Sequence, residues 1–135
     1  MTKILVTGGL GFVGSHLVDS LADAGYDVTV IDNLCSESSS KSFMRGDVTY
    51  WIDDVRNLNT YKYVDKEFDL IYHLAALARI QPSFKDPLTY LSIDIMGTAN
   101  VCEFARRCEA KLVYAGSSSA YGGPMLNPYA FAKVT

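Results

Sequence analysis

The feature that most constrains this chain is a short apolar run followed by spaced glycines and then by a helical pattern. Ile4-Leu5-Val6 is rich in β-formers and ends at Thr7, and glycines occupy positions 8, 11 and 14. From Gly11 to Ala24 apolar residues recur with the period of a helix, and Gly25 stands where a cap glycine would end it. Residues 27–31 are again strand-like, which predicts a βαβ unit with a right-handed crossover.

The spaced glycines predict a cradle for a diphosphate. Gly8 permits a tight turn, Gly11 lets the backbone approach a pyrophosphate, and Gly14 allows close packing of the helix on the strand. The amides at the start of the helix would then bind the anion. A plain glycine turn is the alternative, but the position between a strand and a helix favours the cradle.

Two acidic residues stand at strand ends. Asp32 closes the second strand at about the distance from the glycines that is expected of a ribose-binding acid. A carboxylate there accepts hydrogen bonds from both ribose hydroxyls and repels a 2′-phosphate. No arginine follows until Arg45, so NAD is favoured over NADP. Asp54 follows the third strand and is predicted either to accept from the adenine amine or to cap the next helix.

The rest of the chain continues the alternation of strands and helices. We expect a serine-rich mobile loop over 35–46, strands at 48–52, 68–73 and 111–115, and a short helix at 57–63. A long helix is predicted over 88–107 after Asp86-Pro87, and another begins at Pro128. This pattern predicts a doubly wound parallel α/β sheet (Rossmann-like) of order 3-2-1-4-5, with its strands buried on both faces. A complete fold of this type has a sixth strand, so the sheet is expected to be truncated after about five strands with a bare edge at strand five.

Composition narrows the classes of partner. The chain has 135 residues and a net charge of −3 without a basic stripe, so no nucleic-acid partner is expected. No apolar run approaches the ~18 residues of a membrane span, so no membrane partner is expected either. The three cysteines lack metal-ligand spacing, which predicts no metal site and a reduced, cytoplasmic protein.

Several ordered motifs along the chain resemble the extended short-chain dehydrogenase/reductase family, in its NAD-dependent nucleotide-sugar epimerase/dehydratase branch. The motifs are Thr-Gly-x-x-Gly-x-x-Gly at 7–14, Ile31-Asp32-Asn33-Leu34, Asp54-Val55-Arg56, His73-Leu74-Ala75-Ala76, Asp86-Pro87, Gly97-Thr98, the serine segment 117–122 and Tyr129-x-x-x-Lys133. The resemblance is to the N-terminal part of such proteins. It implies that residues 1–135 form one NAD-binding domain, that the C-terminal substrate domain is absent, and that the full-length form is a homodimer.

The resemblance also implies which residues contact NAD. Phe12 and Val13 would add backbone contacts to the pyrophosphate, and 74–76 would line the cofactor path. His73 is interpreted as a packing residue at the strand end and not as a base. The implied cofactor-binding set is Gly8, Gly11, Phe12, Val13, Gly14, Asp32, Asn33, Asp54, Val55, Leu74, Ala75, Ala76, Tyr129 and Lys133.

Tyr129 and Lys133 are predicted to carry the chemistry together with Ser117. A helix puts Tyr129 and Lys133 on one face, where an ammonium and a cationic nicotinamide favour the phenolate and make it a general base. Lys133 would also hold the nicotinamide ribose, and the resemblance assigns the Ser117 hydroxyl to the reacting sugar oxygen. The alternatives are an ordinary exposed Tyr/Lys pair and a serine-rich turn.

The residues after Ser117 favour one reaction within the branch. Its 4,6-dehydratases and decarboxylases carry acidic residues where this chain has Ser118 and Ser119, so 4-epimerisation of a nucleotide sugar is the best match. Tyr129 would take the proton of the sugar 4-hydroxyl while hydride passes to NAD, and hydride would return to the other face of the 4-keto sugar. The alternatives are a dehydrogenase, reductase or dehydratase of the same branch, or a non-catalytic NAD-binding fragment.

Overall fold

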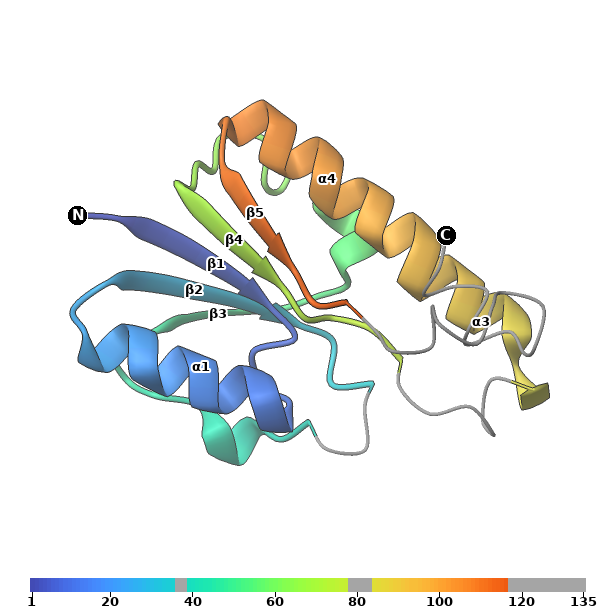
Figure 1. The fold of residues 1–135 in the computed structure, drawn as a ribbon, viewed down its shortest axis with the longest axis horizontal. Helices are drawn as coiled ribbons and strands as arrows, with labels where there is room; N and C mark the ends of the chain where they lie inside the picture. Colours follow the sequence, from blue (N-terminus) through green and yellow to red (C-terminus); the bar gives the residue numbers. More distant parts are fainter. Residues whose placement is uncertain (36–38, 78–83, 117–135) are drawn as a thin grey trace.

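Five parallel strands form the centre of the protein in a computed structural model that describes residues 1–35, 39–77 and 84–116 (Figure 1). The strands are β1 (Lys3–Thr7), β2 (Asp27–Asp32), β3 (Thr49–Ile52), β4 (Leu70–His73) and β5 (Lys111–Tyr114). Their order is β3-β2-β1-β4-β5, and all neighbouring pairs are parallel. The predicted fold class and strand order are confirmed.

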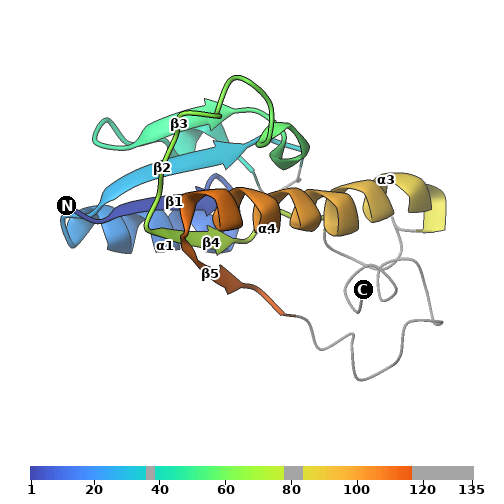
Figure 2. The ribbon, with the colours of Figure 1, turned by 90° about the horizontal axis from the view of Figure 1, so that it is seen from above.

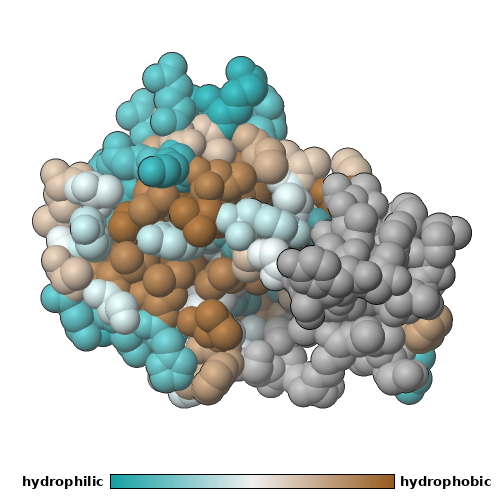
Figure 3. All heavy atoms as spheres, viewed as in Figure 1, coloured by the Kyte–Doolittle hydropathy of each residue, from teal (hydrophilic) through white to brown (hydrophobic). Residues whose placement is uncertain are grey.

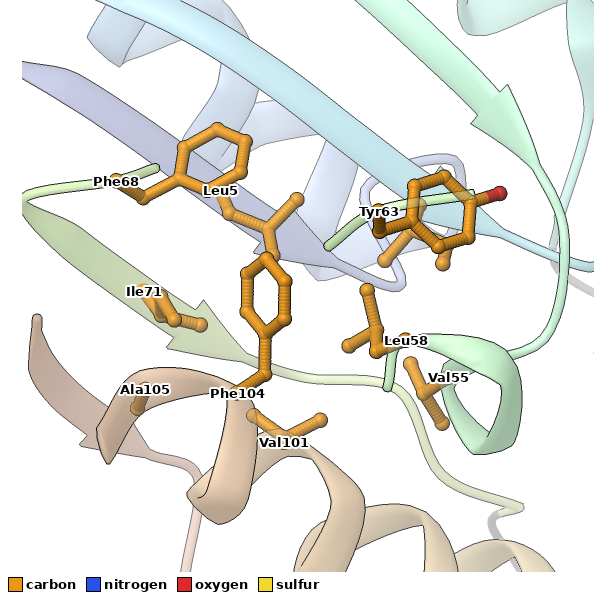
Figure 4. Close-up of a cluster of buried hydrophobic side chains, with 10 residues drawn as sticks. Leu5, Val55, Leu58, Tyr63, Phe68, Ile71, Val101, Phe104 and Ala105 are labelled. Atoms are coloured by element: carbon orange, nitrogen blue, oxygen red, sulfur yellow. The ribbon is translucent and has the colours of Figure 1, made fainter. Parts of the chain in front are cut away.

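Helices cover the two faces of the sheet and divide its apolar side chains into two clusters. Leu5 and Ile71 point toward the face under the long helix, where they pack with its Val101 and Phe104 (Figure 4). The alternate residues of the same strands, including Ile4 and Val6, pack on the other face with Val18 and Leu21 of the first helix. Figure 2 shows the two helices on opposite sides of the sheet.

The first helix, α1 (Phe12–Asp23), begins and ends where the glycines predict. Gly11 is its extended N-cap, and Gly25 follows its last turn with a φ of +89°. The Gly25 and Tyr26 amides donate to the carbonyls of Ala22 and Leu21, 3.0 and 3.2 Å away, which is the Schellman pattern. A side chain at Gly25 would be strained by this backbone conformation.

The long helix predicted over 88–107 is present but has an interruption. It consists of α3 (Pro87–Leu91), one widened π-turn η3 (Ser92–Met96) and α4 (Gly97–Cys108). The Asp86 side chain accepts from the Thr89 amide at its start, as the Asp-Pro signal predicts. The Gly97 amide donates to the Ser92 carbonyl five residues back, and a Cβ on Gly97 would lie 2.9 Å from a methyl group of Val55.

One local prediction was wrong. The helix expected over 57–63 is instead a single 3₁₀ turn, η2 (Val55–Asn57), because Asp54 caps the backbone earlier, and irregular turns follow it. The segment 35–46 was expected to be a patternless mobile loop. Its described part contains another 3₁₀ turn, η1 (Lys41–Phe43), which the Ser40 hydroxyl caps. The loop expected over 117–127 and the helix expected from Pro128 lie outside the described residues.

Within residues 1–35, 39–77 and 84–116, the expectation that helices cover both faces of all strands is not met at β4 and β5. Of the helices that the structure describes, α1 packs on β1 and β2, and α4 packs against β4 and β5. Leu70 and Tyr72 of β4 are therefore only half-buried, and Val113 and Tyr114 of β5 are 42% and 45% exposed. Figure 3, drawn in the same view as Figure 1, shows a broad apolar area on the side of the molecule where β5 lies.

Within the described ranges, no helix is both long enough and apolar enough to cross a membrane.

Candidate functional site

A pocket of about 240 Å³ lies at the carboxyl ends of β1, β2 and β4, beside the point where the strand order reverses. Its walls come from the turn after β1, the end of β2, the turn after β3 and the segment after β4. Ligands of open parallel sheets bind in this crevice, because the chain departs in opposite directions from the two strands that flank it.

The glycine turn forms the first wall, and it has no room for side chains. A Cβ on Gly14 would lie 2.1 Å from the carbonyl oxygen of Gly8, and a Cβ on Gly8 would lie 2.9 Å from the Ala75 nitrogen. Gly8 also has a φ of +74°, a conformation that side chains disfavour. The start of α1 therefore lies directly against the end of β1, and the turn faces the pocket with backbone atoms.

The start of α1 faces the same pocket with its first backbone amides. Gly11 caps the helix without a side-chain hydrogen bond, and the first amides of a helix have no partner within it. Phe12 and Val13 follow it and are 65% and 66% exposed. The helix dipole places partial positive charge at this end, so the arrangement suits an anion such as a diphosphate.

Asp32 connects the end of β2 to the glycine turn. Its buried carboxylate accepts from the Leu10 amide at 3.0 Å through Oδ2 and from the Leu34 amide at 2.7 Å through Oδ1. A carboxylate oxygen has two acceptor positions, so each keeps one for a further donor. The sequence analysis missed this tie to the glycine turn, because only the fold brings Leu10 to the side chain.

Asp54 is a cap in this structure. Its Oδ1 accepts from the amide and Nε of Arg56 at 2.8 and 2.9 Å, and its Oδ2 accepts from Arg56 Nη2 at 2.6 Å and Asn33 Nδ2 at 3.2 Å. The Arg56 guanidinium lowers the pKa of the Asp54 carboxyl. Of the two predicted roles the cap is therefore observed, and an adenine contact would have to replace one of these donors, of which Asn33 is the most distant.

The backbone after β4 forms the opposite wall. The Leu74 and Ala75 amides both donate to Thr7 Oγ1 at 3.0 Å, and the Leu77 amide donates to Asp94 Oδ1 at 2.9 Å. His73 is 2% exposed and lies behind this wall, in hydrogen-bond contact with Thr7. Its burial agrees with the interpretation of His73 as a strand-end packing residue.

The structure brings together every predicted cofactor residue within its described part. These residues all line the pocket: Gly8, Gly11, Phe12, Val13, Gly14, Asp32, Asn33, Asp54, Val55, Leu74, Ala75 and Ala76. Ser117, Tyr129 and Lys133 lie outside the described residues, so their roles remain predictions. Their order in the sequence places them after β5.

Five further residues of the pocket wall were not predicted from the sequence, namely Ile31, Cys35, Ser39, Asp53 and Ile93. Asp53 precedes the predicted Asp54, but its bond to the Tyr63 hydroxyl, 2.6 Å long, depends on the fold. Burial and this carboxylate raise the pKa of Tyr63 to about 12. Partial desolvation and the nearby Asp32 carboxylate raise the pKa of the Cys35 thiol, although the residue as a whole is exposed. Across 1–35, 39–77 and 84–116, no cluster of side chains could hold a metal ion.

Comparison with known proteins connects this geometry to a family. The model of the NAD dependent epimerase/dehydratase family matches residues 4–135. The chain is 40% identical to the uncharacterized protein MJ1055 of Methanocaldococcus jannaschii, over 94% of this chain and 43% of that protein. It is 33% identical to a UDP-glucose 4-epimerase of Neisseria meningitidis serogroup C, over 96% of this chain and 40% of that protein. It is also 36% identical to UDP-glucuronic acid decarboxylase 1 of Danio rerio, over 93% of this chain and 30% of that protein.

A solved structure shows the same fold. The UDP-glucose 4-epimerase of Bifidobacterium longum in complex with NAD+ and UDP superposes with a TM-score of 0.84 at 26% identity, over 98% of this chain and 46% of that chain. This chain thus spans less than half the length of the relatives it matches. From the family match along nearly its whole length, the chain belongs to the NAD-dependent epimerase/dehydratase family.

Proposed function

We propose that this chain binds NAD in the pocket at the carboxyl ends of β1, β2 and β4, as the cofactor-binding part of a nucleotide-sugar 4-epimerase. The observation that carries the proposal is the combination of a glycine turn with no room for side chains, an open helix start above it, and a buried carboxylate at the end of β2. Each of the three parts suits a different group of the same dinucleotide.

The described residues fit an adenine dinucleotide. The first amides of α1 would hold the diphosphate, and the bare turn at Gly8 and Gly14 would let it approach the backbone. The free acceptor positions of Asp32 would take the ribose hydroxyls of the adenosine. Val55 and Asp54 lie on the side of the pocket where the adenine would follow, and residues 74–76 line the path toward the nicotinamide.

Charge favours NAD over NADP. A 2′-phosphate would meet the Asp32 carboxylate, which repels it. The first arginine after β2, Arg45, bonds to Asp19, Asp23 and Asp47 at 2.9–3.2 Å. Its guanidinium is neutralised by these three carboxylates, so it offers little attraction to a further anion.

For the chemistry, bound NAD would supply the hydride acceptor and donor. Tyr129 would remove the proton of the sugar 4-hydroxyl, Lys133 would favour its phenolate form, and Ser117 would hydrogen-bond the reacting oxygen. Serines at 118 and 119 provide no carboxylic acid for the elimination that a dehydratase needs, which supports epimerisation. Because one of the relatives is a decarboxylase, the other reactions of the branch stay as alternatives that the assay must distinguish.

The relatives support a UDP-linked sugar as the substrate, because the proteins of known activity among them are named for UDP-glucose and UDP-glucuronic acid. In the full-length form we propose a homodimer. The cysteines at 35, 102 and 108 are free, which supports a reducing compartment such as the cytoplasm.

Titration calorimetry with NAD and NADP tests the cofactor proposal directly. We expect NAD to bind and NADP to bind at least about tenfold more weakly, because of the charge at Asp32. Absence of NAD binding by folded protein would refute the proposal.

A turnover assay with UDP-galactose and NAD then separates the alternatives. Formation of UDP-glucose without net NADH, abolished in Tyr129→Phe, supports a 4-epimerase. Stoichiometric NADH indicates a dehydrogenase, and NAD binding without turnover across a panel of nucleotide sugars indicates a binding module.

A further inference from the structure

A continuous chain of hydrogen bonds runs behind the pocket wall that follows β4. His73 Nδ1 lies 2.7 Å from Thr7 Oγ1, and His73 Nε2 lies 2.9 Å from Thr98 Oγ1. The Thr98 hydroxyl donates to the carbonyl oxygen of Asp94 at 2.6 Å. This series of hydrogen bonds therefore joins the end of β1, the end of β4 and the π-turn η3. Its two inner residues, His73 and Thr98, have no role in the proposed chemistry.

The direction of this chain follows from counting donors at its two ends. Thr7 Oγ1 already accepts from the Ala75 amide at 3.0 Å and from the Leu74 amide at 3.0 Å, which it shares with the Thr7 backbone carbonyl at 3.1 Å, and a hydroxyl oxygen has two acceptor positions. Its own proton must therefore point to His73 Nδ1, which accepts. At the other end the Thr98 hydroxyl proton points to a carbonyl, so Thr98 Oγ1 accepts from His73 Nε2. Both ends require the same form of the ring, neutral with its proton on Nε2.

We propose that His73 is a positioning residue for the cofactor pocket, and that its neutral Nε2–H form holds the wall of residues 74–77 in place through Thr7 and Thr98. This inference rests on the proposed NAD site. His73 itself does not line the pocket, whereas Leu74, Ala75 and Ala76 do. The ring acts through Thr7, because it fixes the hydroxyl whose oxygen holds the first two amides of the wall.

The π-turn η3 holds the wall of residues 74–77 from the other side, and together with Thr7 and His73 it forms a clamp on this wall. Asp94 is 5% exposed, and its Oδ1 accepts from the Leu77 amide at 2.9 Å while its carbonyl accepts from Thr98. In the widened turn, the Asp94 side chain accepts from the Leu77 amide of the wall, and the Asp94 carbonyl accepts from the Thr98 hydroxyl. Three amides of the wall, at 74, 75 and 77, are therefore held by the side chains of Thr7 and Asp94, and His73 and Thr98 connect Thr7 Oγ1 to the backbone carbonyl of Asp94.

The close packing at Gly8 shows why the position of this wall matters. A Cβ on Gly8 would lie 2.9 Å from the Ala75 nitrogen and 3.0 Å from its Cα, so the glycine turn and the wall touch without slack. A shift of the wall would move the turn that is proposed to hold the diphosphate. His73 thus couples the two sides of the pocket without contacting a ligand.

The first test is the tautomer of His73, read from ¹⁵N–¹H spectra of the histidine-labelled chain without cofactor. The chain has two histidines, and the exposed His16 is an internal reference. We expect His73 to show a pyridine-type Nδ1 and a protonated Nε2. A protonated Nδ1, or protons on both nitrogens, at neutral pH would overturn the proposal. The spectrum does not depend on NAD, so this outcome is separate from the fate of the proposed function.

The second test is the substitution of Thr98. In Thr98→Val, which has the same shape without the hydroxyl, we expect the Ala75 amide to exchange with solvent about tenfold faster and NAD to bind about fivefold to tenfold more weakly. The Leu74 amide also donates to the Thr7 backbone carbonyl at 3.1 Å and should change less. Thr98→Ser should restore both values to within about twofold, since it returns the hydroxyl. Thr49→Val, on an exposed residue at the amino end of β3, is the matched control and should change neither.

The two readouts separate the possible failures. Unchanged exchange at Ala75 in Thr98→Val would overturn the positioning role even if NAD binds. If NAD does not bind the wild-type chain but exchange accelerates in Thr98→Val and recovers in Thr98→Ser, the clamp stands and the proposed cofactor is wrong. If Thr98→Val does not fold, the tautomer of the wild-type ring and the exchange rates of Thr98→Ser decide the proposal.

Discussion

The turn after β1 and the turn after β3 line the same pocket, yet different parts of their residues fix their shapes. The first turn depends on missing atoms, since a Cβ on Gly14 would lie 2.1 Å from the Gly8 carbonyl. The second depends on a charged side chain, since the Asp54 carboxylate holds both the backbone and the guanidinium of Arg56.

This difference shows two routes to a defined loop. Where backbone segments touch, the turn has room only for glycine, so a position of this kind tolerates no larger residue. A polar cap stabilises one conformation by about 0.5–2 kcal/mol, and other residues with similar acceptors can replace it. We therefore expect the first turn to respond to substitution much more strongly than the second.

The largest effect is expected at Gly14. In Gly14→Ala the new methyl group would collide with backbone, which a rotamer change cannot relieve, so we expect a loss of about 2–3 kcal/mol in unfolding free energy and loss of measurable NAD binding. Gly46→Ala is the matched control, because a Cβ there has no atom within 4 Å. Urea unfolding and calorimetry measure both quantities. A stable Gly14→Ala chain with normal NAD affinity would remove the steric account.

A smaller but still large effect is expected at Asp32, whose carboxylate connects the end of β2 to the first turn. The Asp32 carboxylate accepts hydrogen bonds from the Leu10 and Leu34 amides. In Asp32→Asn the side-chain NH₂ would face one of these two amides and could not accept from it. We expect a loss of about 1–3 kcal/mol and an NAD affinity at least about tenfold lower. Affinity for NADP should fall less, because the repulsive charge is gone. Equal losses for NAD and NADP would contradict the proposed place of the ribose.

The contrast between the turns also explains what the sequence could predict. Glycines at 8, 11 and 14 carry their own signal, because few structures need that spacing between a strand and a helix. The cap at Asp54 was foreseen only as one of two alternatives, and the turn it starts was placed too late, because propensity does not decide which polar residue captures the backbone. The tie between Asp32 and Leu10, the π-turn at 92–96 and the bonds of His73 depend on segments far apart in sequence, so no local pattern reveals them.

A moderate effect is expected at Asp54, with a defined dependence on pH. Asp54→Ala removes the cap and should cost about 1 kcal/mol, whereas Asp54→Asn keeps an acceptor for the Arg56 amide and should lose less. Arg56 lowers the pKa of Asp54 in the folded protein, so the charge stabilises the fold above the usual carboxyl pKa of about 3.9 and this gain disappears as the pH falls through the lowered value.

Thermal unfolding of the wild type and Asp54→Asn at a series of pH values measures this dependence. The difference in Tm should be constant from about pH 7 to about pH 5 and shrink at lower pH, where the wild-type side chain becomes neutral. A difference that grows in acid would show that the carboxylate is not stabilised by Arg56.

The smallest effect is expected at Arg45, where charged contacts lie in solvent. Arg45 joins the loop before β3 to α1 through Asp19 and Asp23, but the carboxylate side chains are 52% and 69% exposed, so water and salt screen them. Arg45→Gln should lower the urea midpoint only slightly, and about 1 M salt should remove the difference from the wild type. Arg106→Gln, which breaks an exposed pair with Glu103 on α4, is the control. Arg45→Gln should leave the affinities for NAD and NADP unchanged. A selective loss of NADP binding would show that Arg45 reaches the pocket, and that the loop after β2 belongs with the two turns as a third wall.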